Sequence, residues 1–180
     1  MKPVTKAAMQ PGSDWSKLLK FMSTVDITLT YTAAEAQPDE LAHQIREFMA
    51  YFDILDAKAC AELEIALAEA LINAVDYGCL GLKQSEKAPD LSSPSIYHEK
   101  RKTRLADPAW GSRSIQIRII LDPCRLIFKI TDPGPGIPKR IAKPHDILPY
   151  GRGIPMMREL VDRVIIRRNP SVLTLIKYRG

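Results

Sequence analysis

The chain has 180 residues, of which 46% are hydrophobic and 26% are charged, a composition typical of one soluble globular domain. No apolar run approaches the roughly 18 residues needed to cross a membrane, and the N-terminus lacks the apolar core of a signal peptide, so we expect a cytoplasmic protein. The net charge of +5 is too small to indicate direct nucleic-acid binding. The three cysteines lack metal-like spacing, and Cys60 and Cys79, in an apolar helix, are expected to be reduced.

The N-terminal half is predicted to contain a tail, one strand and two helices. Residues 1–22 form the tail, and residues 23–180 form the domain. Apolar and polar residues alternate from Thr24 to Thr32, which predicts a half-buried strand. Pro38 begins a helix with an acidic first turn, and a longer helix is predicted from Asp56 to Leu80.

The longer helix carries a stripe of polar side chains among alanine, leucine, isoleucine and valine. At about 100° per residue, four polar residues fall on one side of the helix: Glu62, Glu69, Asn73 and Asp76. Buried carboxylates and amides are unfavourable unless they are paired or bound, so the stripe predicts a ligand. Glu69 and Asn73 lie one turn apart, where an amide oxygen suits magnesium and a carboxylate can accept a proton from a hydroxyl group or water.

The second half begins with a region rich in proline and charge, residues 83–112, which predicts a flexible insertion. Periodicity then predicts a helix from Gly153 to about Asp162 and two pairs of strands, at residues 114–121 and 126–130 and at residues 164–167 and 173–178. This order predicts an α/β (α+β) two-layer sandwich, with helices on one face of a mixed, largely antiparallel sheet.

Two glycine-rich loops interrupt these elements. Asp132-Pro133-Gly134-Pro135-Gly136 follows a strand; its glycines permit close approach of a ligand, and its carboxylate can accept a hydrogen bond from an exocyclic amine such as that of adenine. Gly151-Arg152-Gly153 precedes a helix whose free N–H groups can bind phosphate, with Arg152 adding a second contact. Taken singly, each loop is also compatible with a plain turn.

Taken together, the helix and the two loops resemble the ATP-binding domain of the GHKL superfamily (gyrase, Hsp90, histidine kinases and MutL), which has the Bergerat ATP-binding fold. The long helix resembles the N box, and the loops resemble the two glycine boxes, with the lid between them. Within the superfamily, the chain is most similar to the stand-alone anti-sigma factor serine/threonine kinases of bacterial partner-switching systems.

This resemblance implies ATP and Mg²⁺ as cofactors. Glu69 is then the general base, Asn73 the magnesium ligand, and Asp132 the residue that reads adenine. Thr174 is implied to support that aspartate, and Arg152 to act catalytically near the γ-phosphate. The remaining implied cofactor-binding residues are Gly134, Gly136, Ile137, Gly151 and Gly153.

The implied activity is phosphorylation of a serine or threonine on a small anti-sigma factor antagonist. Such kinases often also hold a sigma factor inactive and are often homodimers. Two alternatives are a nucleotide-dependent regulatory module without kinase activity and a detached ATP-binding half of a histidine kinase. Glu69 favours the kinase because a pure binder needs no base, whereas Asp76 stands where histidine kinases usually carry lysine or arginine.

Overall fold

The computed structural model describes residues 24–83, 95–136 and 152–179. The expected N-terminal tail and the expected lid between the glycine loops lie outside these ranges. Two implied nucleotide-binding residues, Ile137 and Gly151, also lie outside them.

Five strands form one sheet in the order β1-β2-β3-β5-β4. Their bounds are β1 (Val25–Thr32), β2 (Ser114–Leu121), β3 (Arg125–Asp132), β4 (Arg163–Arg168) and β5 (Ser171–Tyr178). Every pairing between these described strands is antiparallel, so the sheet is antiparallel rather than mixed. The short links between β2 and β3 and between β4 and β5 permit only this arrangement, because a parallel pair needs a long crossover.

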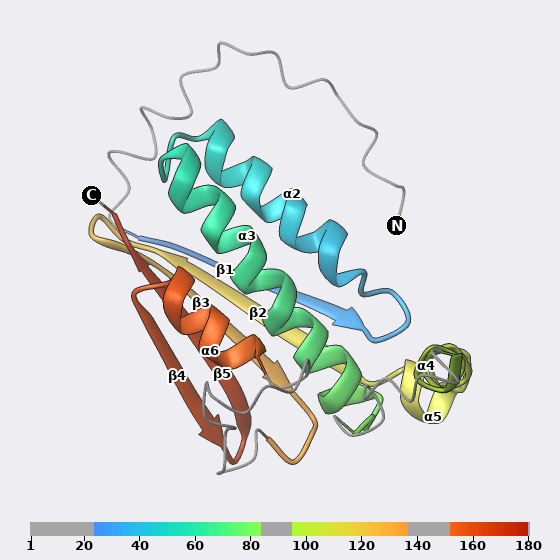
Figure 1. Ribbon diagram of the computed structural model, residues 1–180. Coiled ribbons are helices and arrows are strands. Elements are labelled where there is room, and N and C mark those ends of the chain that lie inside the picture. Colours follow the sequence, from blue (N-terminus) through green and yellow to red (C-terminus); the bar gives the residue numbers. More distant parts are fainter. Residues whose placement is uncertain (1–23, 84–94, 137–151, 180) are drawn as a thin grey trace, which may run out of the picture.

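Helices cover one face of this sheet (Figure 1). They are α2 (Pro38–Tyr51), α3 (Ala57–Ile72) with its continuation η1 (Asn73–Cys79), and α6 (Gly153–Leu160). The middle helix, α3, contacts both α2 and α6. The predicted α+β two-layer sandwich is therefore confirmed. None of the described helices is long and apolar enough to cross a membrane.

The core lies between α3 and the covered face of the sheet. Every second residue of β2 from Ile115 onward is buried, as the alternation predicted, and Ile119 lies opposite the fully buried Phe128 of β3. From the helix side, Leu63 and Leu67 are also fully buried. Burying a side chain of this size contributes about 1.5–3 kcal/mol, so the packing of α3 on the sheet holds the two layers together.

Part of the region that we expected to be an insertion, residues 95–111, is helical. They form α4 (Ser95–Ala106) and α5 (Pro108–Gly111), which lie beyond the end of η1 (Figure 1). Asp107 caps α5 by accepting a hydrogen bond from the N–H of Ala109 at 2.9 Å. Pro108 stands at the start of α5, where proline is tolerated, so it begins a helix here and does not mark a loop.

Candidate functional site

The polar stripe of the long helix divides into three parts. Glu62 accepts a hydrogen bond from Lys177 Nζ at 2.7 Å, and this bond lowers the pKa of its carboxyl below the ordinary value. Asp76 is only 3% exposed and binds Tyr97 and Arg101 of α4. In the part of the chain that the structure describes, Glu69 and Asn73 have no side-chain hydrogen bond or ion pair. They are therefore the two stripe residues that are available to a ligand.

The long helix changes type at Asn73, before it reaches Asp76. Residues Asn73–Cys79 form a π-helix, with i→i+5 hydrogen bonds such as that from Leu80 N to Val75 O at 2.8 Å. The wider π-turn advances each residue by a smaller angle than an α-helix does, which rotates Asp76 off the side predicted from 100° steps. The stripe was expected to be paired or bound, and Glu62 and Asp76 are paired within the chain.

Glu69 and Asn73 face the first turn of α6. A Cβ atom added to Gly153 would lie 2.6 Å from Glu69 Oε2 and 3.5 Å from Asn73 Nδ2, so only glycine permits this approach. Arg152 is the exposed N-cap residue of α6, and its side chain makes no capping hydrogen bond. A helix N-terminus without a side-chain cap leaves N–H groups available to an anion.

Asp132, at the end of β3, has its carboxylate held from two sides. The N–H of Gly134 donates to Oδ1 at 2.8 Å, and the hydroxyl of Ser171 donates to Oδ2 at 2.7 Å. Burial raises the pKa of the Asp132 carboxyl above its ordinary value, and the two hydrogen bonds oppose this shift. A carboxylate has about four acceptor positions, so Asp132 can still accept a hydrogen bond from an amine.

Ser171 supports Asp132, not Thr174 as the resemblance implied. Ser171 lies directly opposite Asp132 across the β3–β5 pair, whereas Thr174 lies opposite Lys129. Because side chains alternate along a strand, residues three apart point to opposite faces, and Thr174 cannot reach the carboxylate. Sequence reasoning missed Ser171 because it follows Asn169-Pro170 and was assigned to the turn; the strand register is the signal that identifies it.

Gly78 connects the helix to the first glycine loop. A Cβ atom on Gly78 would lie 2.7 Å from Asp132 Cβ and closer still to the carboxylate, and one on Gly134 would lie 2.7 Å from Gly78 Cα. Gly136 follows with a φ of 79°, which side chains with a Cβ rarely adopt, and passes close to the backbone of Arg168. The sequence suggested only that Gly78 ends the helix; the structure adds its contact with Asp132.

The site thus has two clusters joined by η1. Glu69, Asn73 and Gly153 form one, and Asp132, Gly134 and Ser171 form the other. The first cluster offers hard oxygen donors beside a helix N-terminus, which suits a cation that also binds phosphate. Within the described residues, no group of three or more His, Cys, Asp and Glu side chains could hold a metal ion. Magnesium bound largely through phosphate oxygens and water does not require such a group.

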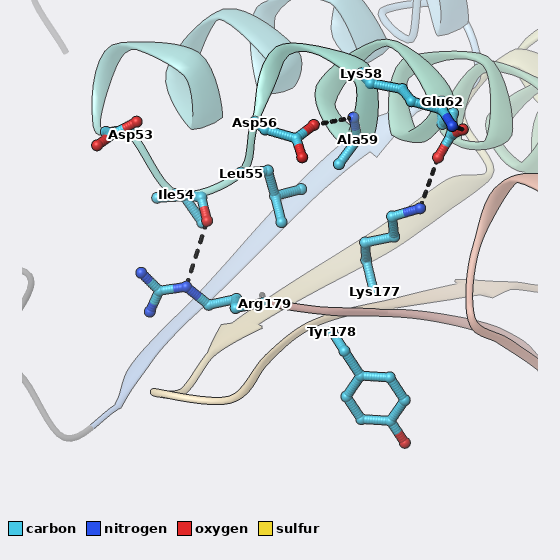
Figure 2. A pocket seen from close by; sticks show the side chains of 10 residues that line it. All are labelled: Asp53, Ile54, Leu55, Asp56, Lys58, Ala59, Glu62, Lys177, Tyr178 and Arg179. Carbon is cyan, nitrogen blue, oxygen red and sulfur yellow. Dashed lines mark hydrogen bonds and ion pairs between the residues drawn. The ribbon is translucent and has the colours of Figure 1, made fainter.

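A hollow of about 590 Å³ lies at the other end of α3, away from these clusters (Figure 2). Charged side chains that line it have partners within the chain. Lys177 binds Glu62, and Arg179 Nε donates to the carbonyl oxygen of Ile54 at 3.3 Å. Of the predicted polar stripe, Glu62 lines the hollow, but its carboxylate is paired with Lys177, so we assign the hollow no part in the candidate site.

The sequence matches no protein-family model and no curated protein. Among solved structures, the chain is similar to the crystal structure of the RsbU and RsbW domains of Rv1364c from Mycobacterium tuberculosis, with a TM-score of 0.49 and 15% sequence identity. The match covers 86% of this chain and 32% of that chain, so the present chain spans about a third of the length of its neighbour.

Proposed function

We propose that the chain binds Mg²⁺-ATP and transfers the γ-phosphate to a serine or threonine of a small protein partner. The observation that carries this proposal is the position of Glu69 and Asn73, which lie one helical turn apart beside Gly153 and have no side-chain partner among the described residues. Phosphoryl transfer depends chiefly on positioning and on neutralising charge, and this cluster offers groups for both.

The adenine base would be bound by the second cluster. Asp132 accepts the hydrogen bond from the exocyclic amine, while Ser171 and the N–H of Gly134 hold its carboxylate in place. The glycines around it let η1 and the loop pack closely against that carboxylate and so fix its position. The phosphates would then extend toward Arg152 and the first turn of α6, where the guanidinium and the free N–H groups offset their negative charge.

Magnesium fits the first cluster, because Asn73 supplies a neutral oxygen ligand and phosphate oxygens and water complete the coordination of this ion in many proteins. When bound, the ion would withdraw charge from the phosphate oxygens and help to orient the γ-phosphate. Glu69 lies one turn from Asn73, so it can face the reacting hydroxyl group without being a metal ligand itself.

In the chemical step, the Glu69 carboxylate takes the proton from the serine or threonine hydroxyl. The hydroxyl oxygen forms a bond to the γ-phosphorus, and the bond from that phosphorus to the β–γ bridging oxygen breaks, which releases ADP. Arg152 offsets the charge that gathers on the transferred phosphoryl group.

As partner we propose an anti-sigma factor antagonist in a bacterial partner-switching system, with a sigma factor as a further binding partner. The alternative of a detached histidine-kinase half is less favoured, because Asp76 is buried under α4 and is not available to a phosphate. A regulatory module that binds nucleotide without transferring phosphate remains the second candidate, since Asp132 and Asn73 alone would suffice for it.

The test is transfer of labelled γ-phosphate from ATP to candidate antagonist proteins, comparing the wild type with Glu69→Gln. General-base catalysis typically contributes about 10²–10⁴-fold, so we expect a loss of at least about 100-fold with little change in ATP affinity. Glu64→Gln is the matched control, because Glu64 lies on the same helix and binds His43 at 3.0 Å, away from the site. Full transfer by Glu69→Gln would refute the base, and ATP binding without labelling of any partner would favour the regulatory module.

A further inference from the structure

The buried carboxylate of Asp76 is held entirely by α4. Arg101 Nε donates to Asp76 Oδ1 at 2.8 Å, and the hydroxyl of Tyr97 donates to Oδ2. A buried carboxylate without partners would be strongly unfavourable, so these two side chains fix α4 against η1. Nothing in the proposed phosphoryl transfer uses Asp76, Tyr97 or Arg101, and they therefore need a separate explanation.

A second set of contacts holds the same two elements together. Arg104 donates to the carbonyl oxygen of Leu80, and Arg113 Nη1 donates to that of Cys79 at 3.2 Å. Both guanidinium groups pack on the ring of Trp110, at 4.3 and 4.0 Å from its centroid. Cations at the C-terminal end of a helix satisfy its free carbonyl groups and interact favourably with its dipole. The α4–α5 unit, residues 95–111, thus caps the end of η1 together with Arg113, which follows it.

The capped segment is also the one that touches the proposed adenine end of the site. Gly78 lies between Asp76 and Cys79. A Cβ atom added to Gly134 would lie only 2.7 Å from the Cα atom of Gly78. Gly78 equally leaves no room for a side chain beside Asp132. A shift of η1 would therefore move the backbone that forms one wall of the proposed adenine site beside the Asp132 carboxylate.

We propose that the α4–α5 unit positions this wall, with Tyr97 and Arg101 acting through Asp76 as positioning residues for recognition of the base. This inference rests on the proposed binding of ATP by Asp132. Neither side chain contacts the nucleotide; they hold η1 in the π-helical form that sets Gly78 against Asp132. The effect should therefore concern the adenine end of the ligand more than the phosphate end.

The experiment compares ATP with inosine triphosphate, which lacks the exocyclic amine, in the full-length protein. Arg101→Met is expected to weaken ATP binding about fivefold, within the range found for residues that act through an intervening element, and to weaken inosine triphosphate binding less. The ratio of the two affinities, measured by titration calorimetry, should fall. Lys102→Met is the matched control, because it removes the same charge from an exposed position on α4 and should leave the ratio unchanged.

Two further variants separate positioning from general destabilisation. Tyr97→Phe removes only the hydroxyl group and should also lower the ratio of ATP affinity to inosine triphosphate affinity. Arg101→Lys keeps the charge, so its ratio should lie between those of Arg101→Met and the wild type. A lowered melting temperature with an unchanged ratio in both Arg101→Met and Tyr97→Phe would overturn the inference alone. Failure of the wild-type protein to bind ATP would overturn the proposed function and this inference together.

Discussion

At the scale of single residues, Asp132 is a buried carboxylate and also the proposed adenine-binding residue. Its carboxylate is buried, which raises its pKa, yet it accepts hydrogen bonds from Ser171 and Gly134 that favour the charged form. The net shift is upward, so the folded chain binds a proton at this group more tightly than the unfolded chain does. Its favourable contribution to stability is therefore full below the ordinary pKa of 3.8 and is lost as pH rises through the raised folded value.

Asp132→Asn should consequently act in opposite directions on stability and on binding. The wild type loses stability as its Asp132 carboxyl ionises, whereas asparagine has no proton to lose. The free energy of unfolding of the variant, measured by denaturant titration, should therefore rise relative to that of the wild type between about pH 3 and about pH 7. ATP affinity should fall about tenfold or more, because the hydrogen bond from the amine to a charged acceptor is lost.

An exposed carboxylate provides the control of opposite sign. Arg118 donates to Asp26 at 2.9 Å and lowers the pKa of its carboxyl below 3.8, so the contribution of Asp26 to stability is present above 3.8 and is lost as pH falls. Asp26→Asn should therefore lose stability relative to the wild type as pH rises over the same interval. If both variants followed the same pH trend, the assignment of Asp132 as a destabilised buried carboxylate would be incorrect.

At the scale of elements, the long helix could be predicted from sequence but its internal change of type could not. The apolar run after Asp56 and the glycines at its end indicated the helix and its length. The far end of the π-helical segment Asn73–Cys79 contacts α4 and the Asp132 loop, which lie about 20 to 60 residues away in the sequence. A helical wheel contains no such contacts, which is why it grouped Asp76 with Glu69.

Gly78→Ala tests whether the packing of η1 on the loop is required. Alanine has the better helix propensity, by about 1 kcal/mol. Against this, its Cβ would lie 2.7 Å from Asp132 Cβ, and that side chain is anchored by two hydrogen bonds and cannot easily move. Overpacking of this kind costs about 1–3 kcal/mol, so we expect a net loss of stability by denaturant titration, together with a loss of ATP binding.

Gly153→Ala is the informative comparison for Gly78→Ala. Its added Cβ would meet the end of the Glu69 side chain, which can rotate away, so the fold should tolerate the change. Phosphotransfer should nevertheless fall, because Glu69 would be displaced from its position beside Asn73. Equal losses of stability in the two variants would show that a Cβ atom beside the anchored Asp132 side chain costs no more than one beside Glu69.

At the scale of the whole molecule, the two layers followed from periodicity. The alternation of Ile115, Ile117 and Ile119 predicted which face of β2 is buried, and Pro38 marked the start of α2 correctly. The α4–α5 unit escaped prediction because its order comes from tertiary partners. Arg101, for example, binds Asp76 and Arg104 binds the carbonyl oxygen of Leu80, and both partners lie more than 20 residues earlier in the sequence. Ser171 escaped for the same reason, since only strand pairing brings it to Asp132.

The last prediction concerns the stability of the whole fold in the presence of nucleotide. The proposed ligand would contact α3, α6 and the end of β3 at once, so its binding should be linked to global unfolding. With Mg²⁺-ATP at 100 times its dissociation constant, the folded state should gain about 2.7 kcal/mol. For a chain of this size that corresponds to a rise in melting temperature of roughly 5–10 °C in a thermal scan.

In Asn73→Ala the gain in stability on adding ATP should be smaller than in the wild type when magnesium is present. The two gains should be equal when magnesium is chelated, because the amide is proposed to act through the ion. An unchanged melting temperature of the wild-type protein would contradict nucleotide binding itself, and equal behaviour of the variant under both conditions would contradict the magnesium assignment.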